Sequence, residues 1–305
     1  MKPICLPLLS LLTLLSSCFT GVESTPKITS GDVRKENIVV TPEDTFLISV
    51  ADAPLPCWEE GKRFVVTDDK IKLLFGHTAP ASETLAGKII TYDGAAEATS
   101  ITGGKVTDLI FRSPAGTRMA YRVNQPLSEL AQKSSLSVPF TVQESMVEEA
   151  RHLLEGKNLY ILTRSWRNDE DNSVHGRQFV PVTIDSVTPG NTVYPIKIAF
   201  TDSQGTSARI FLYPGAKGST PRTFSSLFSF SDPRKKYPGI TDENWQRIID
   251  GHVALDMTRD ECRLSLGAPK DVDRAAGPSY LREVWLYENG IYLVFEDGLL
   301  RHFRK

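Results

Sequence analysis

An internal repeat constrains the fold of this 305-residue chain more than any other feature of the sequence. The segments FRSPAGTRMAYRV (111–123) and FTDSQGTSARIFL (200–212) both carry phenylalanine, four further residues, Gly-Thr and then alternating apolar positions. A constant offset of 89 residues relates them, which indicates two copies of one structural unit. The paired residues are Phe111 and Phe200, Gly116 and Gly205, Thr117 and Thr206, Met119 and Ala208, Tyr121 and Ile210, and Val123 and Leu212.

Weaker matches extend the repeat towards the N-terminus. The same offset aligns Gly87-Lys88 with Gly176-Arg177. Further upstream, residues 60–62 and 155–157 both read Glu-Gly-Lys, displaced by six more residues, as an insertion in a loop would do. We therefore predict that residues 57–124 and 153–213 have the same strand order.

Each copy reads as a set of short strands separated by turn residues, the pattern of a small barrel or sandwich. The Phe-x4-Gly-Thr element predicts a hairpin whose glycine adopts a positive φ, and the alternation after it puts one face in a core. The two copies resemble small five-stranded barrels of the SH3-like type. We predict a mostly β chain with barrel-like repeats at 37–130 and 138–222.

A helix is expected to lead the second repeat. Thr141 followed by Glu144 has the spacing of a capping box, in which the two side chains satisfy the free amides of a helix N-terminus. Val147, Ala150 and Leu154 then lie on one helix face.

Residues 225–305 follow a different pattern, which predicts an α+β domain of two helices and a three-stranded sheet. Thr241 is the expected N-cap of the first helix and Gly251 its end. The strands LREVWLY, IYLVF and LLRHF follow, joined by turns at Asn289-Gly290 and Asp297-Gly298. The second helix is expected to have Thr258 as N-cap, Glu261 as its capping-box partner, Gly267 as a left-handed end and Pro269 as the stop.

Cys262 lies in this second helix and has two possible interpretations. Its charged neighbours would suit a reactive thiol, whereas its position four residues after the N-cap suits a buried packing residue. We favour a structural helix. Cys57 is the other cysteine of the predicted folded region, and the two are either a disulfide or, as we favour, two separate buried thiols.

The N-terminus resembles the export signal of bacterial lipoproteins. Lys2 precedes an apolar run, and Leu15-Ser16-Ser17-Cys18 matches the lipobox of an apolar residue, two small residues and a cysteine. The resemblance implies a signal peptide at 1–17, lipid attachment at Cys18 and a polar tether at 18–36. Because Phe19 and not an acid follows, the resemblance favours the outer membrane, and the lack of an acidic run favours its periplasmic face.

Residues 240–303 resemble the BamE-like (SmpA/OmlA) domain of outer-membrane lipoproteins. The matching residues are Met257-Thr258, Glu261, Leu266-Gly267-x-Pro269, Trp285-x-Tyr287 and Phe295-x-Asp297-Gly298. Asp256 stands where the family usually has glycine, and Cys262 where it usually has valine. The resemblance implies a non-catalytic protein that binds other envelope proteins.

Residue patterns that would carry catalysis or metal binding are weak. No two of the five histidines have metal-ligand spacing, and we expect no metal site, cofactor or catalytic residues. Asp169-x-Asp171-x-Ser173 has the spacing of a calcium loop without its glycine and final acid, so a solvated hairpin loop is favoured. Trp166 between Arg164 and Arg167 is either a partner contact or a core residue.

These observations predict a lipid-anchored, non-enzymatic outer-membrane protein. Its expected role is a protein-interaction or scaffold component of the cell envelope, in outer-membrane assembly or maintenance. The net charge of −2 offers no electrostatic reason to expect nucleic acid as a partner. The alternative is a surface-exposed, ligand-binding or inhibitor-like lipoprotein that uses Trp166 and the barrel loops.

Overall fold

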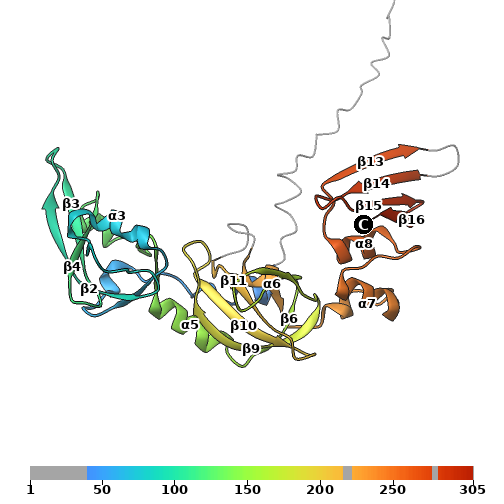
Figure 1. Ribbon diagram of the computed structural model, residues 1–305, viewed down its shortest axis with the longest axis horizontal. Helices are drawn as coiled ribbons and strands as arrows, with labels where there is room; N and C mark the ends of the chain where they lie inside the picture. Colours follow the sequence, from blue (N-terminus) through green and yellow to red (C-terminus); the bar gives the residue numbers. More distant parts are fainter. Residues whose placement is uncertain (1–39, 216–221, 277–280, 305) are drawn as a thin grey trace, which may run out of the picture. The chain divides into compact units, whose positions relative to one another are not determined.

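Three antiparallel sheets hold most of the regular secondary structure of the described residues, so the fold is mostly β, as predicted (Figure 1). The computed structural model describes residues 40–215, 222–276 and 281–304; the predicted signal peptide (1–17), Cys18 and the tether (18–36) lie outside them. The first sheet has the order β4-β3-β2-β1-β5. Its strands are β1 (Arg63–Val66), β2 (Ile89–Thr99), β3 (Lys105–Arg112), β4 (Arg118–Val123) and β5 (Thr141–Gln143).

The second sheet repeats this order and adds a hairpin at one edge. Its order is β12-β6-β9-β10-β11-β7-β8, so β12, β6, β9, β10 and β11 correspond to β5, β1, β2, β3 and β4. The predicted common strand order is thus confirmed. The strands are β6 (Asn158–Ile161), β7 (Ser165–Arg167), β8 (Ser173–His175), β9 (Val180–Pro189), β10 (Ile196–Asp202), β11 (Ser207–Leu212) and β12 (Phe228–Ser229).

The register of the two sheets agrees in detail. Phe111 on β3 pairs with Tyr92, and Phe200 on β10 pairs with Ile184. In each sheet the next residue of the neighbouring strand is left out of the pairing as a bulge, and it is an aspartate in both, Asp93 and Asp185. A bulge bends and twists its strand, so both sheets turn at the same place.

One part of the predicted alignment is wrong. Gly87 has a φ of 75° and donates its amide to the carbonyl of Val66 at the end of β1. The residue that makes the same bond to the end of β6 is Phe179, not Gly176, and Phe179 has a φ of 57°. The β7–β8 hairpin lies between β6 and β9, where the first repeat has the short helices η2 (Asp69–Ile71), α3 (Lys72–Phe75) and η3 (Gly76–Thr78). Because the two repeats carry different insertions at this point, Gly87 corresponds to Phe179, three residues after the predicted Gly176.

The sheets of both repeats are open within the described residues, so the predicted barrel-like closure is not found. Strands β4 and β5 are the edges of the first sheet, and β8 and β12 are the edges of the second. On β4, the Ala120 amide donates to the Thr78 hydroxyl at 3.0 Å. A side chain thus occupies an edge position that a closing strand would need.

The predicted helix of the second repeat exists but begins later than expected. Thr141 lies in β5, where it pairs with Val66, and α5 runs from Glu144 to Leu154 with Gln143 as N-cap. Glu144 instead forms an ion pair with Arg63 at 2.6 Å. Pairing with β1 therefore sets the conformation of Thr141, and the predicted capping box does not form. The predicted apolar face at Val147, Ala150 and Leu154 is buried.

The C-terminal module consists of α7 (Asp242–Asp250), α8 (Arg259–Leu266) and a four-stranded sheet of order β13-β14-β15-β16. Thr241 and Thr258 cap the two helices as predicted, and Glu261 completes a capping box with Thr258. Gly251 ends α7 in the left-handed conformation, whereas Gly267 has φ 87° and ψ −168° and so is not left-handed. The strands are β13 (Asp271–Ala276), which was not predicted, β14 (Leu281–Leu286), β15 (Tyr292–Glu296) and β16 (Leu299–Arg304).

Two hydrophobic cores underlie these sheets. The first lies within the first repeat and includes Phe64, Phe75 and Phe111. The second is shared: it includes Phe200 of the second sheet and Trp285 of the C-terminal module. The remaining short helices are α2 (Pro42–Thr45), η1 (Leu55–Cys57), α4 (Leu127–Leu130), α6 (Phe224–Leu227) and η4 (Pro233–Lys236).

Candidate functional site

Trp166, for which the sequence left a partner contact and a core position open, is a core residue. It is 2 % exposed, and its ring meets that of Phe200 edge-on with centroids 5.1 Å apart. Its indole Nε1 donates to the carbonyl of Thr163 at 2.8 Å, so the polar atom is satisfied as well. An added Cβ on Gly176 would lie 1.9 Å from the Trp166 ring, which explains the glycine there. The surface-binding alternative thereby loses its anchor residue.

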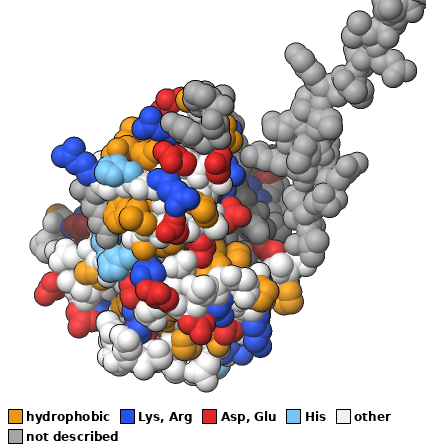
Figure 2. Space-filling view, turned by 90° about the vertical axis from the view of Figure 1, so that its right-hand side faces the viewer, with side chains coloured by type: hydrophobic (Ala, Val, Ile, Leu, Met, Phe, Trp, Pro, Cys, Tyr) orange, Lys and Arg blue, Asp and Glu red, His pale blue; other side chains and the backbone are white. Residues whose placement is uncertain are grey.

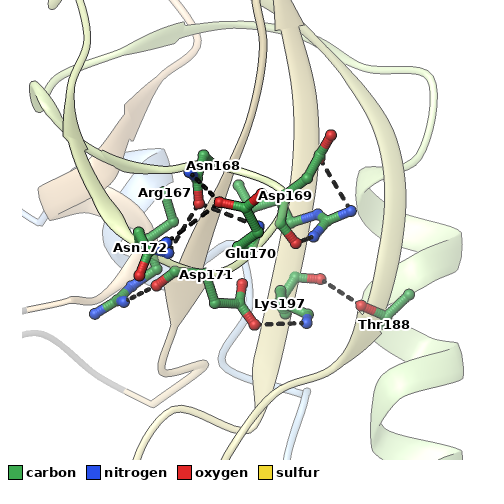
Figure 3. Close-up of polar contacts among 9 residues, drawn as sticks. Arg167, Asn168, Asp169, Glu170, Asp171, Asn172, Thr188 and Lys197 are labelled. Carbon is green, nitrogen blue, oxygen red and sulfur yellow. Dashed lines mark hydrogen bonds and ion pairs between the residues drawn. The ribbon is translucent and has the colours of Figure 1, made fainter.

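The polar loop after β7 is held together by its own contacts (Figure 3). The side-chain oxygen of Asn168 accepts from the amides of Glu170 and Asn172 at 3.1 and 2.9 Å. Asp169 pairs with Arg209 at 3.1 Å, and Asp171 pairs with Lys197 at 3.3 Å. The two carboxylates of the calcium-like spacing therefore already have cationic partners.

Arg167, the second predicted partner contact, makes contacts within the same loop and sheet. Its Nη1 donates to the carbonyl of Asp171, and its guanidinium lies over the Phe211 ring at 5.4 Å. No group of three metal-ligating side chains is found in the parts of the chain that the structure describes.

Two side chains of the second repeat bind the carboxyl ends of α7 and α8. The amide nitrogen of Gln178 donates to Ile248 O at 3.1 Å and to Leu264 O at 2.6 Å, and its backbone amide donates to Ile249 O at 3.2 Å. Arg164 Nη1 donates to Ser265 O at 3.0 Å. Carbonyls in the last turn of a helix lack the usual partner four residues further on, so these contacts give them donors from another part of the fold.

The Arg164 guanidinium is partly buried beside the ends of α7 and α8. It has no ion pair among the described residues, and burial lowers its pKa, an effect that the nearby Asp250 carboxylate partly offsets. The carboxyl ends of two helices supply negative potential there, which favours a cation. Gly251 makes room for it, because an added Cβ would lie 1.2 Å from Arg164 Nη1.

A groove of about 800 Å³ lies beside these contacts. Leu162, Phe179 and Ile291 contribute apolar surface, and the exposed His175 and Asn289 contribute polar groups. Tyr287, also in the groove, donates its hydroxyl to Gly267 O at 3.3 Å, and burial raises the pKa of Tyr287 to about 12. The groove therefore offers apolar surface with hydrogen-bonding groups beside it.

Cys262 is a packing residue. It is fully buried in the shared core, and burial, aided by the charge of Glu261, raises the pKa of its thiol to about 12. A thiol that stays protonated and shielded at neutral pH is a poor nucleophile. Cys57 is exposed and not buried as expected, and both cysteines are free.

Several residues at this site were missed from the sequence. Gln178 and Phe179 belong to no motif, and the sequence around Gly251 indicates only a helix end. The predicted lipid attachment residue Cys18 lies outside the described residues, and no helix within the described ones is long and apolar enough to cross a membrane. Comparison with protein families, curated proteins and solved structures gives no match for this chain.

Proposed function

We propose that this chain is a non-catalytic, lipid-anchored outer-membrane protein that binds an envelope protein partner through the groove beside Gln178 and Arg164. The observation that carries the proposal is this groove of about 800 Å³, which apolar and polar side chains line together. Its role would be that of an interaction or scaffold component in outer-membrane assembly or maintenance, with the anchor at Cys18 on the periplasmic face.

The C-terminal module supports the proposed kinship with BamE-like domains at one specific position. Asp256 stands where that family usually has glycine, and it adopts a φ of 67°. This is the left-handed region that glycine favours and that aspartate tolerates better than most residues. The departure in sequence is therefore compatible with the same backbone turn, and Cys262 is buried as the family's valine would be.

The two repeats extend the same proposal. Two similar open sheets joined by a helix provide several binding surfaces in one anchored chain, as in other repeat proteins that act as scaffolds. We assign them this scaffold role, and the SH3-like comparison remains part of the proposal.

Fractionation of cells that carry Cys18→Ser tests the anchor. We expect this variant to leave the membrane fraction or to remain as an uncleaved precursor, because the thioether can no longer form. A partner that co-purifies with the unchanged protein from solubilised membranes should no longer co-purify with the Cys18→Ser variant. Normal processing of Cys18→Ser, with retention in salt-washed membranes, would contradict lipid anchoring.

A further inference from the structure

The outer face of the C-terminal sheet is mostly exposed. The inner face carries Trp285, Leu293 and Phe295, which are buried in the shared core together with Cys262 of α8. Because side chains alternate along a strand, the residues between these three point away from the helix. Figure 2 looks onto the side of the molecule where this module lies, and it shows basic and acidic side chains interspersed with hydrophobic ones.

The centre of this outer face is apolar. Val284 on β14 pairs with Val294 on β15, and Leu286 pairs with Tyr292 in the next row of the same two strands. Val294 is buried and Val284 and Tyr292 are half-buried, whereas Leu286 is 44 % exposed. Apolar side chains at the centre of a face with charged residues around them are the usual composition of a protein interface.

The titratable residues of the outer face are arranged by sign. They are Asp271 and Asp273 on β13, Arg282 on β14, Glu296 on β15, and His302 and Arg304 on β16. β13 and β16 are the two edges of this sheet. The two signs nearly cancel over the whole face, but one edge is acidic and the opposite edge is basic.

This arrangement is complementary to itself. When two copies pack face to face about a two-fold axis parallel to the strands, β13 of one copy lies over β16 of the other, and β14 lies over β15. Asp271 and Arg304 end the same row across the sheet, so each meets the other residue type on the second copy. Arg282 and Glu296 also share a row and meet in the same way. An axis across the strands would instead put the two acidic edges together.

We propose that the outer face of the C-terminal sheet binds a second copy of this chain, face to face about a two-fold axis parallel to the strands. Four strands about 4.8 Å apart give a small face, and two such faces would bury on the order of 900 Å² in total. This is the low end for specific interfaces, so the dimer is weak, and the charges set its orientation more than its affinity. No residue of this face lines the groove beside Gln178, so the two surfaces are distinct.

Thiol cross-linking of the full-length chain in permeabilised cells tests this geometry. All copies carry Cys57→Ser, which removes the exposed native thiol; one copy also carries Asp271→Cys, and a differently tagged copy carries Arg304→Cys. The cross-linker spans about 8 Å, because packed sheets lie about 10 Å apart. We expect the mixed pair to give about tenfold more dimer than either variant alone, since like positions lie three strand spacings apart in the proposed dimer. Equal yields from mixed and single variants, or no dimer at all, would overturn the proposal.

Reversal of the edge charges provides a matched control, with the cysteine pair Arg282→Cys and Glu296→Cys as the reporter of dimer formation. Asp271→Lys and Arg304→Glu should each lower the yield about tenfold, because each puts like charges opposite each other at both edges of the dimer. A mixture of the two variants should regain the yield, since every edge charge then meets its opposite, and this recovery also shows that both variants are folded. Asp260→Lys makes the same charge change on α8 and should have no effect. Loss without recovery in the mixture, or an equal loss with Asp260→Lys, would overturn the assignment.

Discussion

Phe200→Ala is expected to destabilise the second repeat and the C-terminal module together, by about 3–5 kcal/mol. Phe200 is fully buried in the core that these two parts share, against Trp166, so the cavity weakens both. Phe111→Ala should cost a similar amount but act on the first repeat alone, because Phe111 lies in the separate first core. Hydrogen exchange followed by mass spectrometry distinguishes the two results, since it reports local opening.

The expected pattern is specific for each variant. Phe111→Ala should raise exchange in β1 to β4, and Phe200→Ala should raise it in β9, β10 and α8. Leu73→Ala and Val193→Ala change exposed side chains of the two repeats and should leave exchange as it is. If Phe111→Ala raised exchange in α8 as much as in β3, the two cores would not be independent.

Gly251→Ala is expected to cost about 3–4 kcal/mol, well above an ordinary surface substitution. An alanine at φ 70° costs about 1–2 kcal/mol by itself. The remainder comes from Arg164, whose guanidinium occupies the space of the new Cβ and would lose its hydrogen bond to Ser265 O. The free energy of unfolding in urea measures the cost.

A double-mutant cycle separates the two contributions. In the Arg164→Ala background the guanidinium is absent, so Gly251→Ala should cost only the backbone term of about 1–2 kcal/mol. The difference between the two backgrounds is the energy that couples Arg164 to the end of α7. If Gly251→Ala cost the same with and without Arg164, the arginine would not occupy this place in solution.

The parts of the fold that could be predicted depend on local chemistry. The Phe-x4-Gly-Thr hairpins need a positive φ at Gly116 and Gly205, and both glycines have it, at 87° and 82°. The capping residues Thr241 and Thr258 also act within one helical turn. In contrast, Thr141 has the pattern of a cap but lies in a strand. It pairs with Val66 of β1, 75 residues earlier in the sequence, and this pairing decides its conformation.

The candidate site could not be predicted, because its contacts join distant segments. Gln178 is an ordinary loop residue until the ends of α7 and α8 meet it, about 70 and 86 residues further along the chain. Phe179 adopts the left-handed conformation that glycine fills in the first repeat, and its ring stacks on Trp245 of α7 at 5.5 Å. The docked helix thus stabilises a strained residue that a local pattern would have excluded. β13 was missed because DVDRAA has only weak apolar alternation.

Site-specific photo-crosslinking in intact cells tests most directly whether the groove beside Gln178 and Arg164 binds a partner protein. A photoreactive residue at His175 or Asn289, both exposed in the groove, should form an adduct with one envelope protein. The same residue at Val193, exposed on the second repeat but outside the groove lining, should not form it. Adducts of equal yield at all three positions, or none at His175 and Asn289 in membrane-anchored protein, would contradict the account.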